Sequence, residues 1–254
     1  MAVISRADIE QFREQGFVVI PGVLGERLLA LGHRVATAML TAEPPAPRHR
    51  GFYFLWPQFA GPSACGHDHG LLRFYRESGI AALAAGLLRP DLPPAEPDRA
   101  QLAVTVPRWP HRPGGPHVDG ITPPEPSGRP GTFSLLAGVW LTDHSEKNCG
   151  NLWVWPGSHL RAGAWLADRG ADALVGVWPE RSYPPIGLGE PVQLTGPAGS
   201  VLLAHYLLGH NIGGHDGPDG GPMRQAVYYR LQARGHLARW QATLTDPLAE
   251  FRDS

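Results

Sequence analysis

The chain has 254 residues, 43% of them hydrophobic, and a formal net charge of −1. This balance removes the electrostatic attraction on which nucleic-acid binding and adsorption to anionic membranes depend, so we expect a small-molecule substrate, no nucleic acid and no membrane as partners. No apolar run approaches the roughly 18 residues of a membrane span. The polar, helix-like residues 1–11 predict no signal peptide, and therefore a cytoplasmic location.

The first part of the chain, residues 1–99, is predicted to be mainly helical. A Ser-x-x-Asp capping box at Ser5 and Asp8 begins a short helix, and Gly16 ends it. The other elements of this part are marked by their periodicity and by flanking Gly and Pro: a strand at 17–20 and helices at 26–41 and 71–88.

Between residues 100 and 234, short apolar runs recur between turn signals. Runs of this kind predict the strands of a β-sandwich or barrel, here at 101–106, 132–141, 152–155, 192–195, 200–205 and 225–231. Pro156–His159 is predicted as a tight turn and Gly213–Gly221 as a mobile loop. With residues 235–254 as a C-terminal tail and no linker, the fold class is mainly β with flanking helices, in a single domain of residues 1–254.

The pattern with the clearest chemistry is His117-Val118-Asp119, followed about ninety residues later by His210. Residues i and i+2 of an extended segment project from the same face, so His117 and Asp119 can bind one metal ion together. Two imidazoles and one carboxylate form the facial triad of open iron sites, which leaves coordination positions for substrate and oxygen. Two sheets folded over one another would bring His210 to the same mouth.

Several neighbouring residues compete for these roles. His205 and His215 are rivals for the third ligand, although His205 lies on an apolar strand as a core histidine would, and His215 lies among glycines where we expect it to be exposed. Arg224 and Arg230 lie on the same face of one predicted strand, so either could supply a cation.

The segment Cys65–His69 contains one cysteine and two histidines, which are good zinc ligands. A structural zinc site needs four ligands, and Asp68-His69 before an apolar stretch is more typical of a helix start. We therefore expect Cys65 and Cys149 to be free, buried thiols. Three nearby aromatic residues fit a substrate-facing lid and packing of the helices on the sheets equally well: Tyr53, Trp56 and Phe59.

Four segments together resemble the phytanoyl-CoA dioxygenase family: residues 5–24 (SRADIEQFREQGFVVIPGVL), His117-Val118-Asp119-Gly120, residues 140–159 (WLTDHSEKNCGNLWVWPGSH) and residues 199–229. Their order and spacing extend the resemblance over nearly the whole chain, with its weakest part between residues 43 and 100. Members of this family are Fe(II)- and 2-oxoglutarate-dependent oxygenases. The resemblance implies a double-stranded β-helix (jelly-roll, cupin-like) core for residues 100–234.

Carried over to this chain, the resemblance implies that His117, Asp119 and His210 are the catalytic residues that hold Fe(II). It also implies that Arg224 binds the co-substrate 2-oxoglutarate. An arginine suits that role, because its planar fork can donate two hydrogen bonds to the carboxylate that points away from the metal.

Further residues around the co-substrate follow from the same resemblance. Trp140 matches a tryptophan that lines the 2-oxoglutarate pocket, and Gln101 matches a polar side chain near it. Ile212 departs from the pattern, because relatives often carry a small hydroxyl residue there. A hydrogen bond to the co-substrate is therefore either missing or supplied elsewhere, with Thr132 and Ser134 as candidates.

The implied activity uses O2 to hydroxylate, or otherwise oxidise, an unactivated carbon of a small molecule. By analogy, this molecule is an intermediate of bacterial secondary metabolism. Asp119 argues against halogenation, because related halogenases carry a small residue at that position. The alternative is a non-catalytic metal-binding β-helix protein with a sensing or structural role, which would not need Arg224. The oligomeric state is left open.

Overall fold

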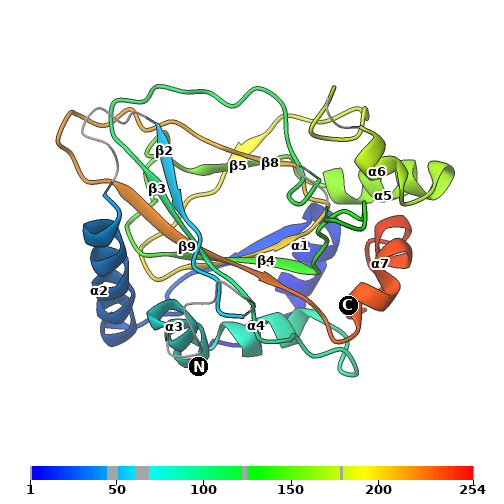
Figure 1. The fold of residues 1–254 in the computed structure, drawn as a ribbon, viewed down its shortest axis with the longest axis horizontal. Coiled ribbons are helices and arrows are strands. Elements are labelled where there is room, and N and C mark those ends of the chain that lie inside the picture. The colour runs from blue at the N-terminus through cyan, green and yellow to red at the C-terminus, as the bar shows by residue number, and fades with distance from the viewer. Residues whose placement is uncertain (1, 45–50, 61–68, 122–124, 178–179, 254) are drawn as a thin grey trace.

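Two antiparallel sheets form the centre of the protein, and the small sheet lies opposite the large one (Figure 1). The computed structural model describes residues 2–44, 51–60, 69–121, 125–177 and 180–253. The six-stranded sheet has the order β1-β7-β4-β9-β3-β2: β1 (Phe17–Ile20), β7 (Val201–His205), β4 (Leu135–Trp140), β9 (Arg224–Leu231), β3 (Gln101–Thr105) and β2 (Phe52–Leu55). The three-stranded sheet has the order β6-β5-β8: β6 (Val192–Gln193), β5 (Leu152–Val154) and β8 (His210–Ile212).

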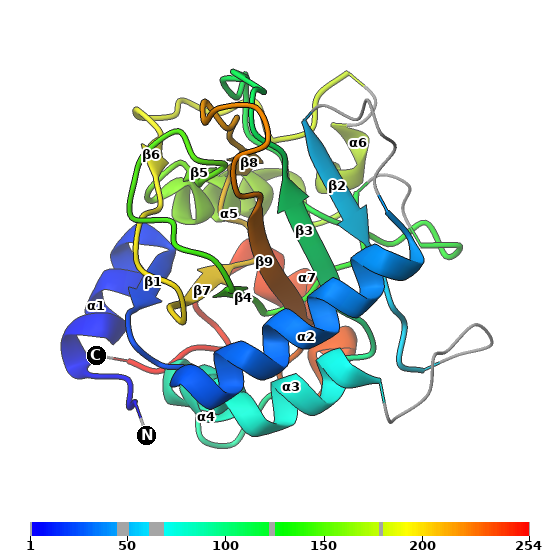
Figure 2. The same ribbon diagram turned by 90° about the vertical axis from the view of Figure 1, so that its left-hand side faces the viewer.

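Helices flank these sheets on two sides (Figures 1 and 2). The helices of the first hundred residues are α1 (Arg6–Gln15), α2 (Glu26–Ala42), α3 (Gly70–Ser78) and α4 (Ile80–Leu87). Those of the second half are α5 (Ser158–Arg169), α6 (Ala173–Gly176) and α7 (His236–Thr245). None of the helices in the described part of the chain combines the length and the apolar character needed to cross a membrane.

The central strand β9 shows how the sequence separates two cores. Val227, Tyr229 and Leu231 are buried on the face that packs on the helical layer, where the Tyr229 hydroxyl donates to the carbonyl of Leu71 in α3 at 2.7 Å. Ala226 and Tyr228 are buried on the opposite face, between the sheets. Alternate residues of a strand point to opposite faces. One face of β9 therefore packs in the apolar core beneath the helices, and the other faces the space between the two sheets.

The structure confirms the predicted start of the chain. The Ser5 side chain accepts from the backbone of Asp8 and Asp8 accepts from the backbone of Ser5, which completes the capping box, and Gly16 ends α1 with φ of 85°. The strand predicted at 17–20 is β1, and β2, which was not predicted, joins the large sheet as well.

The structure differs from three predictions in where helices begin or end. The helix expected at 71–88 is divided at Gly79, whose φ of 78° is a left-handed conformation that ends α3 and starts α4. The predicted turn at Pro156–His159 is a turn only as far as Gly157, after which α5 begins at Ser158. The predicted tail, residues 235–254, contains α7, which packs against α5.

Candidate metal and co-substrate site

His117, Asp119 and His210 meet at the mouth between the two sheets. An isolated antiparallel bridge pairs the backbones of His117 and His210, with N–O distances of 3.0 and 3.4 Å. Oδ1 of Asp119 lies 3.5 Å from Nε2 of His117 and 3.7 Å from Nε2 of His210. Among the described residues, these three form the one group of His, Cys, Asp and Glu side chains close enough to hold a metal ion.

The protonation states of these side chains suit metal binding. Burial is the main cause that lowers the pKa of His117, so its ring is neutral at pH 7. Nδ1 of His210 lies 3.0 Å from the carbonyl of Leu208, an arrangement that leaves Nε2 as the ligand atom. Burial disfavours ionisation of Asp119, but the Arg230 guanidinium outweighs it and holds the pKa of this carboxyl well below its usual value.

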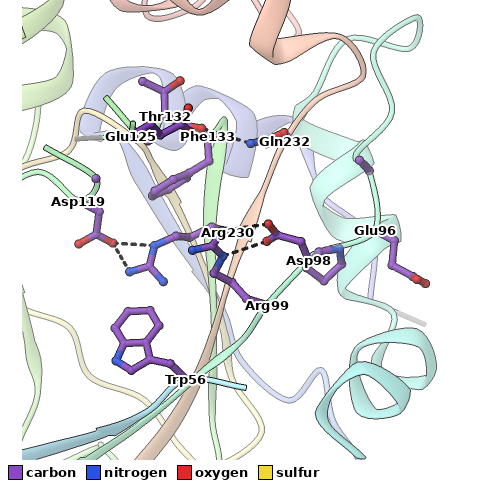
Figure 3. Close-up of a pocket in the computed structure, with 14 residues that line it drawn as sticks. Trp56, Glu96, Asp98, Arg99, Asp119, Glu125, Thr132, Phe133, Arg230 and Gln232 are labelled. Atoms are coloured by element: carbon purple, nitrogen blue, oxygen red, sulfur yellow. Dashed lines mark hydrogen bonds and ion pairs between the residues drawn. The ribbon is translucent and has the colours of Figure 1, made fainter. Parts of the chain in front are cut away.

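Arg230 in β9 holds the carboxylate from the other side. Its Nε and Nη2 lie 3.1 and 2.5 Å from Oδ2 of Asp119, and both side chains are 17% exposed. Because both donors go to Oδ2, Oδ1 is the oxygen that faces the two histidines. The guanidinium also lies over the ring of Trp56, 4.8 Å from its centroid (Figure 3).

The backbone around Asp119 is fixed by close packing. Tyr206 donates its hydroxyl to the carbonyl of Asp119 at 3.0 Å. Gly120 has φ of 76°, and a Cβ atom there would collide with the carbonyl oxygen of Gly131. Only glycine fits this position without strain, so the glycine of the His-Val-Asp-Gly motif supports the conformation that presents the ligands.

A cavity of 490 Å³ extends from the ligands between the sheets. Arg224, Tyr228 and Arg230 line it from β9, and alternate spacing along the strand places all three on the same face. Gln101 lines it from the neighbouring β3, where its Oε1 lies 3.4 Å from Nη2 of Arg230. Ile212 lines it from the small sheet.

Arg224 is the unpaired cation of this cavity. Its residue is 3% exposed, its Nη2 donates to the Tyr228 hydroxyl at 2.7 Å, and its Nε is buried with no hydrogen-bond partner in the described part of the protein. It also forms no ion pair with any described acid, whereas its rival Arg230 is committed to Asp119. A buried guanidinium with an unused donor can bind an anionic group, because leaving such a donor unsatisfied is costly.

Other residues that the resemblance placed around the co-substrate have different surroundings. Trp140 is fully buried, and its ring packs 4.9 Å from that of His144; it is not among the residues that line the cavity, so its role there stays a prediction. Thr132 and Ser134 are not among the residues that line this cavity, and both contact His236 in a buried network. These contacts favour the alternative that the hydrogen bond is missing, and a role of either residue beside the co-substrate stays a prediction.

The rival histidines are both buried away from the ligand cluster. His205 is 5% exposed and hydrogen-bonded to the carbonyl of Pro247 and the backbone of Leu207, which confirms it as a core residue. His215 was expected to be exposed, but it is also 5% exposed, and its backbone bridges to Trp109 and to Cys149.

The glycine-rich segment 213–221 is held more closely than a mobile loop. At Gly214, a Cβ atom would collide with the backbone of Trp109 and His111, so the glycine permits a close approach of two chain segments. Ion pairs of Asp216 with Arg112 at 2.7 Å and of Asp219 with Arg108 at 3.0 Å hold the rest.

The remaining sequence predictions concern the cysteines, the segment Cys65–His69 and three aromatic residues. Residues 65–68 lie outside the described ranges, and with them Cys65 and most of the zinc hypothesis. His69 caps α3 by accepting from the backbone of Leu71 at 3.2 Å. Cys149 is free, as predicted, but half-buried. Of the three aromatic residues, Phe59 is 2% exposed in the core, whereas Trp56 is 45% exposed and lines the cavity.

A second cavity, of 530 Å³, opens on the other side of Arg230 (Figure 3). It shares Trp56, Asp119 and Arg230 with the first cavity, so the carboxylate ligand is reached from both. No pattern in the sequence pointed to this cavity or to the contacts of Arg230 and Tyr228. Strand alternation with Arg224 was the one signal that could have placed both residues on the inner face.

Comparisons with known proteins found solved structures of similar fold. The non-heme alpha-ketoglutarate-dependent carbocyclase SnoK from nogalamycin biosynthesis is similar in fold, with a TM-score of 0.56 and 22% identity over 93% of this chain and 90% of its own. HygX from Streptomyces hygroscopicus, solved with nickel and 2-oxoglutarate, has a TM-score of 0.56 and 17% identity over 91% and 88%. A prolyl hydroxylase from Trichoplax adhaerens has a TM-score of 0.54 and 12% identity over 91% and 90%.

These structures share the double-stranded β-helix fold with this protein, and at such identities they show the fold alone. No curated protein matches the sequence. Residues 12–220, however, match the family model described as phytanoyl-CoA dioxygenase (PhyH). Together with the facial arrangement of His117, Asp119 and His210, this match over most of the chain identifies the protein as a member of the phytanoyl-CoA dioxygenase family.

Proposed function

We propose that the protein is an Fe(II)- and 2-oxoglutarate-dependent oxygenase that uses O2 to oxidise a small molecule. The observation that carries the proposal is the pairing of an open three-ligand cluster with a buried, unpaired arginine in one cavity. A metal site alone would need no such cation, so this pairing favours the oxygenase over a non-catalytic metal-binding protein.

The residues present fit both groups. Two neutral imidazoles and an ionised carboxylate are the ligands that Fe(II) takes in facial-triad oxygenases. The unused Nε donor of Arg224 fits the carboxylate of 2-oxoglutarate that points away from the metal. When bound, the iron and 2-oxoglutarate would supply the oxidising power of the reaction with O2.

The protein's own side chains then orient the reaction. Arg230 holds Asp119 so that Oδ1 faces the metal position, Arg224 and Tyr228 fix the far end of 2-oxoglutarate, and the buried walls exclude water. Trp140 and Gln101 remain candidate co-substrate contacts, with Gln101 on the cavity wall.

The substrate is proposed to be an intermediate of secondary metabolism. Support comes from the solved structures of similar fold: SnoK and an epimerase, SnoN, belong to nogalamycin biosynthesis, and HygX has been solved with hygromycin B bound. Hydroxylation is the proposed default outcome. The reactions of these similar structures include carbocyclisation and epimerisation, which the same metal site would serve.

The test is anaerobic titration of the protein with Fe(II) and 2-oxoglutarate, followed by the weak visible charge-transfer band of the chelate. We expect the band in the wild type and a 2-oxoglutarate affinity about 10- to 100-fold lower in Arg224→Met, because hydrogen bonds to charged groups contribute about 1.5–3 kcal/mol each. Arg224→Lys keeps the charge but loses the fork, so its affinity should fall between the two.

Arg73→Met is the matched control, because Arg73 pairs with Glu77 on the exposed face of α3. It should bind 2-oxoglutarate as the wild type does. Metal uptake without any band would favour the non-catalytic alternative, and equal binding by Arg224→Met would remove the assignment of Arg224.

A further inference from the structure

The second cavity has a wall of mixed charge. Glu96, Asp98 and Glu125 contribute carboxylates, and Arg99 and Arg230 contribute guanidinium groups (Figure 3). Asp98 and Arg99 pair with each other at 3.1 Å while remaining 58% and 48% exposed. A carboxylate has about four acceptor positions and a guanidinium five donors, so this pair keeps most of its hydrogen-bonding capacity for a ligand.

This wall selects against three classes of ligand. Each of its charged groups already has a partner of opposite sign: Asp98 pairs with Arg99, Arg230 with Asp119, Glu96 with Arg76 and Glu125 with Arg129. An anion or a cation therefore finds no uncompensated charge in this wall. An apolar molecule would bury polar groups without partners, at a cost of about 1–3 kcal/mol for each group. A hydroxyl group both donates and accepts, so a molecule that carries many hydroxyls can satisfy neighbouring donors and acceptors at once.

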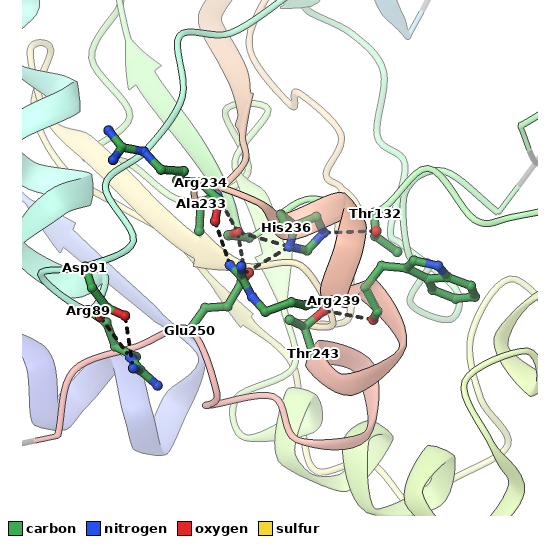
Figure 4. A network of polar contacts seen from close by, with 11 residues as sticks. Arg89, Asp91, Thr132, Ala233, Arg234, His236, Arg239, Thr243 and Glu250 are labelled. Carbon is green, nitrogen blue, oxygen red and sulfur yellow. Dashed lines mark hydrogen bonds and ion pairs between the residues drawn. The ribbon is translucent and has the colours of Figure 1, made fainter.

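Thr132 adds a hydroxyl of fixed position to the wall. Buried Glu250 accepts from Nη2 of Arg239 at 2.8 Å and interacts with Nδ1 of His236 at 2.9 Å (Figure 4). Burial disfavours ionisation of Glu250, but its hydrogen bonds, first that with His236, lower the pKa of this carboxyl below its usual value. An ionised carboxylate only accepts, so Nδ1 of His236 carries a proton.

Nε2 of His236 lies 3.0 Å from Oγ1 of Thr132, and this contact fixes the position of the hydroxyl. Thr132 lines the second cavity, and a hydroxyl can both donate and accept a hydrogen bond. The network thus holds Thr132 in one position at the cavity wall, as a hydrogen-bond partner for a hydroxyl of the ligand.

Trp56 completes the wall with an apolar surface. Its side chain is 45% exposed, and the Arg230 guanidinium lies over its ring. An exposed indole beside hydrogen-bonding groups suits a ligand that has C–H surface as well as hydroxyls. Because the cavity reaches Asp119, a molecule held here lies beside the metal ligands.

Resting on the proposed oxygenase function, we propose that the second cavity is the substrate site and that the substrate is a neutral, polyhydroxylated, carbohydrate-like molecule. Thr132 and Asp98 are its specificity-determining residues. The proposal concerns recognition only and does not depend on which carbon is oxidised.

Ligand-observed saturation-transfer NMR tests this with four kinds of probe: the neutral disaccharides sucrose and trehalose, the anion trehalose phosphate, the polycation kanamycin and the apolar phenol naringenin. The protein is measured alone and with Zn(II) and 2-oxoglutarate. We expect a disaccharide to bind more tightly than the charged and apolar probes. A protein that binds naringenin or a charged probe but neither disaccharide would overturn the proposal, and so would a protein that binds none of the probes.

Variants locate the binding. Thr132→Val keeps the shape and removes the hydroxyl, so disaccharide affinity should fall about fivefold, in the range expected for one hydrogen bond. Asp98→Ala, at an exposed position that cannot unfold the core, should also weaken binding. Thr243→Val in α7 is the control, because this threonine bonds only the carbonyl of Trp240 in its own helix and does not line the cavity.

Disaccharide binding that neither Thr132→Val nor Asp98→Ala weakens would contradict this placement. The anaerobic charge-transfer band, measured on the same preparation, keeps the two proposals separate. Sugar binding without a band would reject the oxygenase and leave the sugar site, whereas a band without sugar binding would reject the sugar site alone.

Discussion

Arg230→Gln should weaken metal binding without unfolding the protein. In the wild type, both nitrogen donors of Arg230 hold Oδ2 of Asp119, at 3.1 and 2.5 Å, which directs Oδ1 toward the two histidines. Glutamine is too short to hold the carboxylate in this way, so the carboxylate can rotate away from the ligand position. Loss of a partner of this kind costs about 10- to 100-fold in metal affinity, or about 1.4–2.7 kcal/mol.

Calorimetric titration with Mn(II) measures this difference, and urea unfolding of the metal-free protein checks stability in parallel. Arg230→Lys keeps the charge but not the fork, so its affinity should lie between those of the wild type and Arg230→Gln. Arg89→Gln, which breaks an exposed ion pair with Asp91, should bind Mn(II) normally. An unchanged or higher affinity in Arg230→Gln would refute the reasoning, because repulsion between guanidinium and metal would then outweigh the positioning of Asp119.

Two further predictions concern stability. Gly120→Ala should lower the free energy of unfolding by about 3 kcal/mol or more, since it adds a collision with Gly131 to the strain of a positive φ. Gly128→Ala, with φ of 81° and open space around it, should lower it by only about 1 kcal/mol. Urea unfolding compares the two variants, and equal losses would contradict a collision at Gly120. Burial lowers the pKa of His159 from 6.5 to about 4, so the unfolded chain takes up a proton at this residue before the folded protein does. The free energy of unfolding should therefore hold above pH 6.5 and fall toward pH 4 by about 1.4 kcal/mol per pH unit for this histidine, and His159→Gln should reduce that slope; an unchanged slope would assign it to other groups.

Local signals in the sequence predicted what local physics determines. The capping box and Gly16 located α1, and the spacing of His117 and Asp119 placed both on one face. That His210 joins them depends on a backbone bridge between segments ninety residues apart. The sequence could only suggest this long-range pairing, by analogy with a known family.

Long-range packing determines the features that were missed. The glycine-rich sequence of residues 213–221 predicts a mobile loop. In the structure, Gly214 instead allows this segment to lie close against the backbone of Trp109 and His111. Pro156-Gly157 reads as a turn, and the helix that follows is stabilised by burial of Ala162 and Leu166 against the inner core. The pairing of Arg230 with Asp119 depends on how segments far apart in the chain are aligned, and local sequence patterns do not reveal this alignment.

The most direct test of the oxygenase assignment is succinate formation from 2-oxoglutarate by the purified protein with Fe(II), ascorbate and air. Wild type and Asp119→Ala are compared, without and with the neutral glycosides that bind in the NMR experiment. The account predicts succinate in the wild type, more of it in the presence of substrate, and none above background in Asp119→Ala. No succinate from a wild-type protein that binds iron, or equal amounts from both proteins, would contradict it.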